Sequence, residues 1–105
     1  MERFELDELI GRREETGRAY LEFLRSAALS AGLYELPAGG SDPQQPHGED
    51  EVYVVMRARA QIRVGKEDQT VSEGSVVFVA AGVEHRFHDI AEDLAVLVVF
   101  APPES

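Results

Sequence analysis

The sequence of 105 residues contains no cysteine. This absence excludes a disulfide framework, a thiolate metal site and a cysteine nucleophile. Any metal ion in this protein must therefore be bound by imidazole, carboxylate or amide groups.

Positive charge is also scarce. The sequence has 10 basic and 20 acidic residues, which gives a formal net charge of −10. Nucleic-acid binding depends on Lys and Arg side chains that neutralise phosphates, and an anionic membrane surface attracts the same residues. We therefore expect neither nucleic acid nor a membrane as a partner.

Long hydrophobic runs are missing as well. The longest strongly apolar stretch, residues 94–103, is about half the length that a helix needs to span a bilayer. Residues 1–5 lack the basic region followed by an apolar one that is typical of a signal peptide. We therefore expect a cytoplasmic protein, and a chain of this length supports one hydrophobic core and one domain.

The first part of the chain has a helical pattern. Residues 5–16 begin with acidic side chains, have two arginines in their second half and carry apolar residues at helical spacing, so we predict a short helix that Gly17 ends. Residues 18–26 fit either a helix or a two-sided strand. We interpret them as a strand because everything that follows is strand-like.

The rest of the chain alternates between short apolar segments and turns rich in Gly, Pro and acidic residues. We expect strands at 28–37, 51–56, 59–64, 69–71, 76–79, 85–88 and 94–100, with residues 65–68 as a hairpin turn. Such spacing is typical of a sandwich or a closed barrel, and no helix is placed to cover a parallel sheet. We predict one all-β domain over residues 1–105, with a helix and arm at 1–18 and a barrel at 19–101.

The three histidines carry the most informative pattern. His47 is followed four residues later by Glu51, and in an extended chain Gln45, His47 and Glu51 would point to one face. A barrel would let His85, on another strand, converge on the same interior. Each of these side chains could instead be solvated. His88 has the opposite parity to His85, so we expect it on the surface.

Two imidazoles, one carboxylate and one amide oxygen form a nitrogen and oxygen ligand set. It suits one divalent transition metal per chain, which could be Fe, Mn, Ni, Co or Zn. The same parity rule places Tyr53, Val55 and Phe87 on the walls of a substrate pocket, although ordinary core packing explains them equally well. Arg57, Arg59 and Arg63 form a run that we expect to face solvent, the alternative being a carboxylate-binding Arg at the barrel mouth.

Two segments of the sequence resemble the conserved motifs of the cupin family. The first family motif reads Gly, five residues, His-x-His, three or four residues, Glu, six residues and Gly. This sequence has Gly39 or Gly40, then residues 45–47, then Glu51, and finally Ala58. An amide at Gln45 therefore stands where the family has its first His.

The second family motif reads Gly, five residues, Pro-x-Gly, two residues, His, three residues and Asn. This sequence has Gly74, then residues 80–82, then His85, and finally Asp89. Together the two motifs cover about residues 39–89, roughly half of the chain. The resemblance implies a cupin-type β-barrel, which is a double-stranded β-helix or jelly roll.

The departures from the motifs bear on the turns and on the fourth ligand. Gln45 predicts a weak or water-bridged metal ligand, because an amide oxygen binds late transition metals less well than imidazole does. Ala58 replaces a Gly, and because Ala with a positive φ is unfavourable we expect a different local turn there. Ala80 replaces the usual Pro, and Asp89 replaces the Asn.

The resemblance implies a metal site formed by His47, Glu51 and His85. It also implies a mononuclear metal-dependent enzyme, dioxygenase-like or isomerase-like, that acts on a small organic molecule. Because one fold hosts many activities, two alternatives stay open: a non-catalytic metal- or metabolite-binding module, and a cupin with an empty site. We also expect a homodimer, because such a barrel has exposed edge strands and residues 4–23 carry more apolar side chains than a small core needs.

Overall fold

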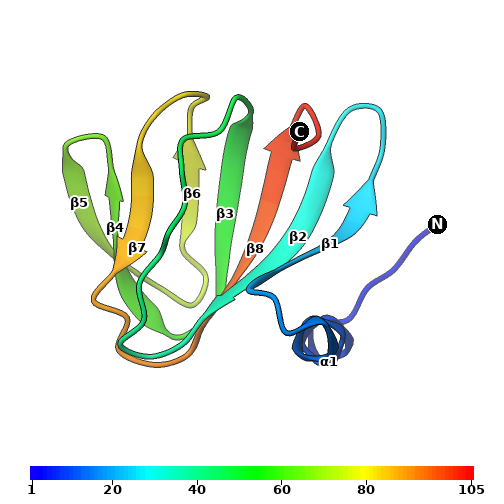
Figure 1. The fold of residues 1–105 in the computed structure, drawn as a ribbon, viewed down its shortest axis with the longest axis horizontal. Helices are drawn as coiled ribbons and strands as arrows, with labels where there is room; N and C mark the ends of the chain where they lie inside the picture. Colours follow the sequence, from blue (N-terminus) through cyan, green and yellow to red (C-terminus); the bar gives the residue numbers. More distant parts are fainter.

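The computed structural model describes all residues from 1 to 105. One helix, α1 (Leu6–Thr16), precedes eight strands. The strands are β1 (Tyr20–Arg25), β2 (Ser30–Leu36), β3 (Asp50–Arg57), β4 (Arg59–Val64), β5 (Glu67–Ser72), β6 (Val76–Val79), β7 (His85–His88) and β8 (Leu94–Ala101). They form a five-stranded sheet in the order β1-β2-β8-β3-β6 and a three-stranded sheet in the order β5-β4-β7 (Figure 1).

The helix follows the expected rules for its two ends. Asp7 and Glu8 lie in its first turn, where the positive end of the helix dipole favours acidic groups. Gly17 adopts a left-handed conformation with φ 68°, and its N–H donates to the carbonyl oxygen of Glu14. The prediction of a short helix that Gly17 ends is confirmed.

Residues 20–25 form a strand, which resolves the ambiguity in the sequence pattern. β1 pairs antiparallel with β2, from Tyr20 opposite Tyr34 to Arg25 opposite Ser30. The register shifts between Glu22 and Leu24. This irregularity explains why the apolar residues of the segment did not alternate cleanly.

The core lies where the two sheets face each other. Its largest fully buried side chains include Tyr53, Phe87, Leu94 and Val96. The strand pairs are all antiparallel, and several strands bring alternate residues into one interior. The predicted all-β cupin-type barrel with a short N-terminal helix is confirmed.

The helix covers the outer face of the five-stranded sheet, away from this core. Its buried residue Leu9 packs against Leu33 and Ala95, and partly buried apolar residues surround them. The rings of Phe4 and Phe23 are 4.8 Å apart. The excess of apolar residues in 4–23 is therefore used inside the chain, and the homodimer stays a prediction.

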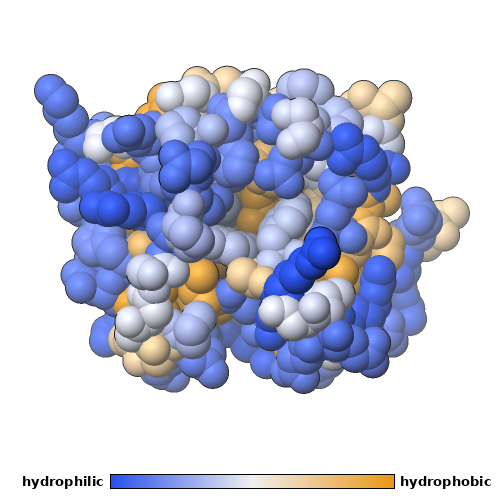
Figure 2. All heavy atoms as spheres, in the orientation of Figure 1, coloured by the Kyte–Doolittle hydropathy of each residue, from blue (hydrophilic) through white to orange (hydrophobic).

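Hydrophilic residues cover most of the face drawn in Figure 2, where apolar atoms show mainly in recesses between them. The exposed large hydrophobic residues include Val76 and Phe78, at 67% and 61% exposure. Both lie on β6, an edge strand of the five-stranded sheet. No helix of the structure has both the length and the apolar character needed to cross a membrane.

The hairpin between β4 and β5 is tighter than expected. The last pair in its register is Val64 with Glu67, so the turn consists of Gly65 and Lys66 rather than residues 65–68. Gly65 has φ 58°. A glycine with positive φ permits a two-residue turn, and two more residues join the strand pairing.

Ala58 corrects an expectation from the sequence. It has φ 74°, so it keeps the left-handed conformation that a glycine would favour, and the expected change of turn is wrong. Asp89, at the position of the family's Asn, is also left-handed with φ 49°. The pairing of β3 with β8 shifts register between Val55 and Arg57, next to Ala58. The strand pairing around Ala58 therefore outweighs the preference of an alanine for a negative φ.

We predict that the effect of a substitution at position 58 on stability depends on whether the new side chain is branched at Cβ. The left-handed conformation costs an L-residue about 1–2 kcal/mol, and more when the side chain is branched at Cβ. Ala58→Val should lower the free energy of unfolding by at least about 1 kcal/mol, whereas Ala58→Gly should not lower it. Urea denaturation measures both. Ala80→Val, at an exposed turn residue, is the control and should change stability by less than about 0.5 kcal/mol; an equally destabilising control would contradict the prediction.

We also predict that His88 gives the stability of the protein a small pH dependence. Nε2 of His88 lies 2.5 Å from Oδ1 of Asp68. Asp68, and then Asp89, raise the pKa of His88. Because the pKa of His88 is raised in the folded state, the pair stabilises the folded protein fully at pH values below the pKa of an unfolded His, about 6.5. This stabilisation is lost as the pH rises through the pKa of the folded state. Since the pair is exposed and Arg63 also contacts Asp68, the effect should stay below about 1 kcal/mol. The stability difference between the wild type and His88→Gln should shrink from pH 5.5 to pH 9; a difference independent of pH contradicts the assignment.

Candidate metal centre

A buried carboxylate fixes the loop between β2 and β3. Asp42 accepts hydrogen bonds from the hydroxyl of Tyr34 at 2.6 Å and from the backbone N–H of Phe87 at 3.0 Å. It also accepts the backbone N–H and the side-chain amide N–H of Gln44. The loop is thereby attached to β2 on one side and to β7 on the other.

The same carboxylate orients the amide of Gln44. Because Nε2 of Gln44 donates to Asp42, the amide oxygen Oε1 points the other way, where it accepts the hydroxyl of Tyr53 at 3.0 Å. Oε1 also lies 3.3 Å from Nε2 of His47. Burial, and then the nearby Glu51, raise the pKa of Tyr53, so its hydroxyl remains a donor.

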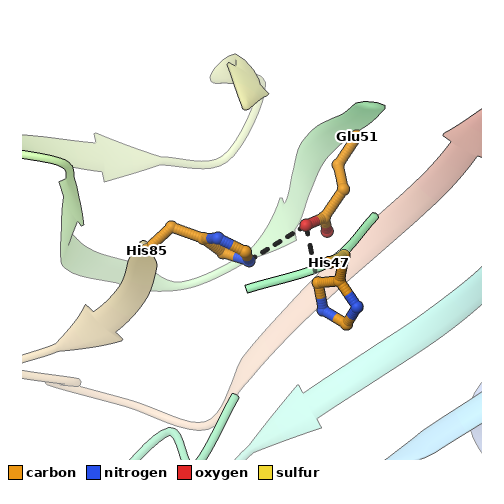
Figure 3. A group of neighbouring side chains, drawn as sticks. All are labelled: His47, Glu51 and His85. Carbon is orange, nitrogen blue, oxygen red and sulfur yellow. Dashed lines mark ion pairs between the residues drawn. The ribbon is translucent and has the colours of Figure 1, made fainter. Parts of the chain in front are cut away.

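His47, Glu51 and His85 converge in the structure (Figure 3). They come from the loop before β3, from β3 itself and from the start of β7. Nε2 of His85 lies 2.9 Å from Oε1 of Glu51, and Nε2 of His47 lies 3.8 Å from the same oxygen. One donor atom from each residue lies within 4.8 Å of the others. The three residues that the spacing singled out are therefore brought together.

The two imidazole rings present the same nitrogen to Glu51. Nδ1 of His85 is 2.9 Å from the carbonyl oxygen of Val83, which can only accept, so Nδ1 carries a proton. Nδ1 of His47 lies 3.3 Å from Oε2 of Glu104. This arrangement leaves the Nε2 atoms to face the carboxylate, as they do in metal sites where an outer partner holds the other ring nitrogen.

The facing atoms lack hydrogen-bond partners. Both carboxylate oxygens of Glu51 and Nε2 of His85 are buried, and their contact does not have hydrogen-bond geometry. Burial acts to lower the pKa of His85, but Glu51 and the carbonyl of Val83 outweigh it and raise that pKa. A buried, unpartnered carboxylate is costly unless a cation is close to it. The donor set therefore fits a divalent transition metal.

The structure places Gln45 differently from the sequence expectation. Gln45 is exposed, and Gln44 is the amide that contacts His47. Parity fails here because residues 41–47 form a loop containing Pro43 and Pro46 rather than an extended strand. The only sequence signal for Gln44 was Asp42, a residue type that often bonds to the backbone two residues later.

The expected pocket walls are mostly core residues. Val55 and Phe87 are buried in the main hydrophobic cluster. Tyr53 is buried as well, and its ring centre is 5.9 Å from that of His85, so it contacts the candidate site. His88 lies outside the group and pairs with Asp68. The arginines at 57, 59 and 63 are exposed, as expected.

A small cavity adjoins His47 and is lined in part by residues of β1, β2 and β8. It measures about 130 Å³. We call it the Tyr20 cavity; it is lined by Tyr20, Tyr34, Gln44, His47, Val98, Phe100 and Glu104. A separate polar hollow of about 280 Å³ is lined by His85 among others and includes Arg63 and Arg86.

Glu104, near the end of the chain, forms part of the wall of the Tyr20 cavity. The backbone N–H of Glu104 donates to Oγ of the buried Ser30, and Arg25 donates to the carbonyl oxygen of Glu104. Burial, with the neighbouring carboxylates of Glu49 and Glu51, raises the pKa of Glu104 against the opposing effect of His47. No local pattern pointed to Glu104 or Tyr20, because their contacts join segments far apart along the chain.

Comparisons with known proteins agree with the fold. The family model described as "Cupin domain" matches residues 32–100. An uncharacterized protein of Streptomyces coelicolor is 57% identical over 105 residues, which are all of both chains. The crystal structure of TT1209 from Thermus thermophilus is 30% identical, covers 98% of this chain and 99% of its own, and has a TM-score of 0.79.

A further solved structure is that of DMSP lyase DddQ from Ruegeria pomeroyi. It is 25% identical, covers 72% of this chain and 39% of its own, and has a TM-score of 0.68. The matched family model extends over more than half of this chain and includes His47, Glu51 and His85. The chain belongs to the cupin family.

Proposed function

We propose that this protein binds one divalent transition metal ion through His47, Glu51 and His85. The observation that supports the proposal is the convergence of the three side chains around buried atoms of Glu51 and His85 that have no hydrogen-bond partner in the protein. The amide oxygen of Gln44 is the fourth protein ligand in this proposal, because it faces His47 and is held there by Asp42 and Tyr53.

We further propose that the protein is a mononuclear metal-dependent enzyme for a small organic molecule. Two imidazoles and one carboxylate leave coordination positions open, and an ion there acts as a Lewis acid toward substrate oxygens. This chain's own residues exclude water around Glu51 and His85, whose side chains are each 1% exposed. His47, at 20%, is the ligand that a substrate can reach. A solved neighbour named as a lyase supports an enzyme.

A non-catalytic binding module is the alternative. One observation favours it: Tyr53 donates to Gln44 and its pKa is raised, so the nearest polar group is not poised to accept a proton. Turnover by the metal-loaded protein, with oxygen uptake for a dioxygenase-like reaction or without it for an isomerase-like one, separates the two functions.

We predict that metal binding depends on the three clustered residues. His47→Ala and the isosteric Glu51→Gln should each weaken Co²⁺ or Zn²⁺ binding by about a hundredfold, since the first removes a direct ligand and the second replaces the anionic ligand by a neutral amide. Isothermal titration of protein purified without a histidine tag measures the affinity and the number of ions per chain. His88→Ala is the matched control and should bind as the wild type does. If the double variant His47→Ala/His85→Ala remains folded and still binds one ion with unchanged affinity, the site assignment is wrong.

A second prediction compares two adjacent amides. Gln44→Ala should weaken metal binding about tenfold, because it removes an oxygen that faces His47 or that positions it. Gln45→Ala should leave the affinity unchanged, since Gln45 is exposed. The same titration measures both, with circular dichroism to show that Gln44→Ala remains folded. The reverse result would restore Gln45 as the fourth ligand.

A further inference from the structure

The outer face of the five-stranded sheet is apolar over three of its strands. In β3 and β8, residues that enter the main core alternate with residues that point to the outside. β6 follows the same alternation, with Val79 in the core and Phe78 on the outer face. The outward side chains of these three strands form a set that we call the outer patch: Val52, Val54, Val76, Phe78, Leu97 and Val99.

The strand register makes the outer patch contiguous. Val52 lies opposite both Phe78 on β6 and Val99 on β8, so these three side chains form one row. The other three form a second row two residues further along the strands, with Val54 in its middle. Side chains directly opposite each other on antiparallel strands contact one another on the same face. The six residues are therefore one surface rather than scattered single residues.

The helix does not cover the outer patch. Its cluster contains Leu9, Leu33 and Ala95 but none of the six patch residues, and Figure 1 shows α1 beside β1 and β2, away from β3 and β6. Val76 and Phe78 are mostly exposed, and the other four patch residues are half-buried. An antiparallel sheet with one face toward water normally presents polar residues there. A contiguous apolar face of this kind marks an interaction surface.

The outer patch carries no charge, in contrast to the rest of the chain. Charged residues make up 29% of the sequence and the net charge is −10, so most approaches of two copies would bring like charges together. None of the patch residues is charged, and residues 74–83, which include β6 and its flanking turns, contain no charged residue either. Exposed edge strands usually carry a charge or a proline that prevents association. β6 has neither, so a second copy can approach it without meeting a carboxylate.

The same charge distribution argues against other occupants. A partner attracted electrostatically to this acidic chain would bring Lys and Arg side chains, and the neutral patch offers them nothing to pair with. An anionic lipid surface would be repelled by the net charge of −10. A second copy brings the same neutral surface, and two antiparallel sheets pack face to face about 10 Å apart. The outer patch therefore fits a second copy of this chain.

We propose that the outer patch is the centre of a two-fold interface between two copies of this chain, in which the two five-stranded sheets pack face to face. Twofold pairing is the commonest closed symmetry and uses the same surface of both copies. The interface includes no residue of the candidate metal centre, so this proposal does not depend on metal binding.

A two-fold axis along β3 fits the shape of the outer patch. It places β6 of one copy over β8 of the other, so the exposed ring of Phe78 meets the half-buried Leu97 and Val99. A mostly apolar groove of about 350 Å³ continues around β6 from the patch. Because a stable interface buries about 800 Å² per partner, the outer patch forms the middle of the contact and the groove lies at its margin.

Sedimentation velocity of the wild type over a concentration series measures the association. We expect a dimer at micromolar concentration. Raising the NaCl concentration from about 0.05 M to about 0.5 M should leave the association unchanged or strengthen it, since salt screens the repulsion between acidic copies. A wild type that remains monomeric at several hundred micromolar, or a dimer that salt dissociates, would overturn the proposal.

Two variants locate the interface. Phe78→Lys and Val99→Lys each bring two like charges into the contact and should weaken the dimer at least about thirtyfold, the effect of losing a central interface residue. Ser72→Lys adds the same charge at an exposed position of β5, on the other sheet, and should dimerise as the wild type does. Val99 also separates face-to-face packing from pairing of two β6 edges, because β8 lies two strands away from that edge. If Val99→Lys is folded by circular dichroism and its dimer is as stable as that of the wild type, the proposed interface is wrong.

Methyl NMR of the wild type locates the interface without any substitution. On dilution of chelator-treated protein, the methyl signals of Val52, Val54 and Val99 should shift, whereas those of the buried Leu36 and Ile90 should not. Unchanged signals from the outer patch in a sample that dissociates on dilution would contradict the proposal. Since the chelator removes metal ions, a failure of metal binding leaves this result unaffected.

Discussion

The hydrogen bonds of one buried carboxylate hold the candidate site together. Asp42 accepts donors from β2, from β7 and from its own loop. A second anchor is the backbone N–H of Gly82, which donates to the carbonyl oxygen of His47 at 2.7 Å. Together these bonds fix the loop that carries Gln44 and His47 relative to Glu51 on β3 and His85 on β7.

Sequence reasoning succeeded where periodicity or a turn residue decided the structure. The helix ending at Gly17 and most of the strands followed from local patterns, and the spacing of His47, Glu51 and His85 identified residues that do converge. It failed at Gln45, because alternation applies only to extended backbone, and at Ala58, because the strand pairs around it impose a conformation that its own preference disfavours.

The remaining features depend on contacts that local patterns do not encode. Glu104 reaches His47 because Ser30 and Arg25 hold its backbone, although both lie more than 70 positions before it in the chain. A chain with a net charge of −10 also concentrates several carboxylates around one small region. That concentration is unfavourable in isolation, and a cation beside Glu51 would offset it.

The absence of a side chain at Gly32 affects how the barrel interior can change during evolution. The residue has no side chain, yet the ring of Tyr20 occupies the space that a methyl group at this position would need. A single substitution at position 32 would displace that ring and reshape the cavity beside His47, while the residues that converge on Glu51 stayed where they are. The shape of the barrel interior beside His47 can therefore change through a substitution on β2 that leaves His47, Glu51 and His85 themselves unaltered.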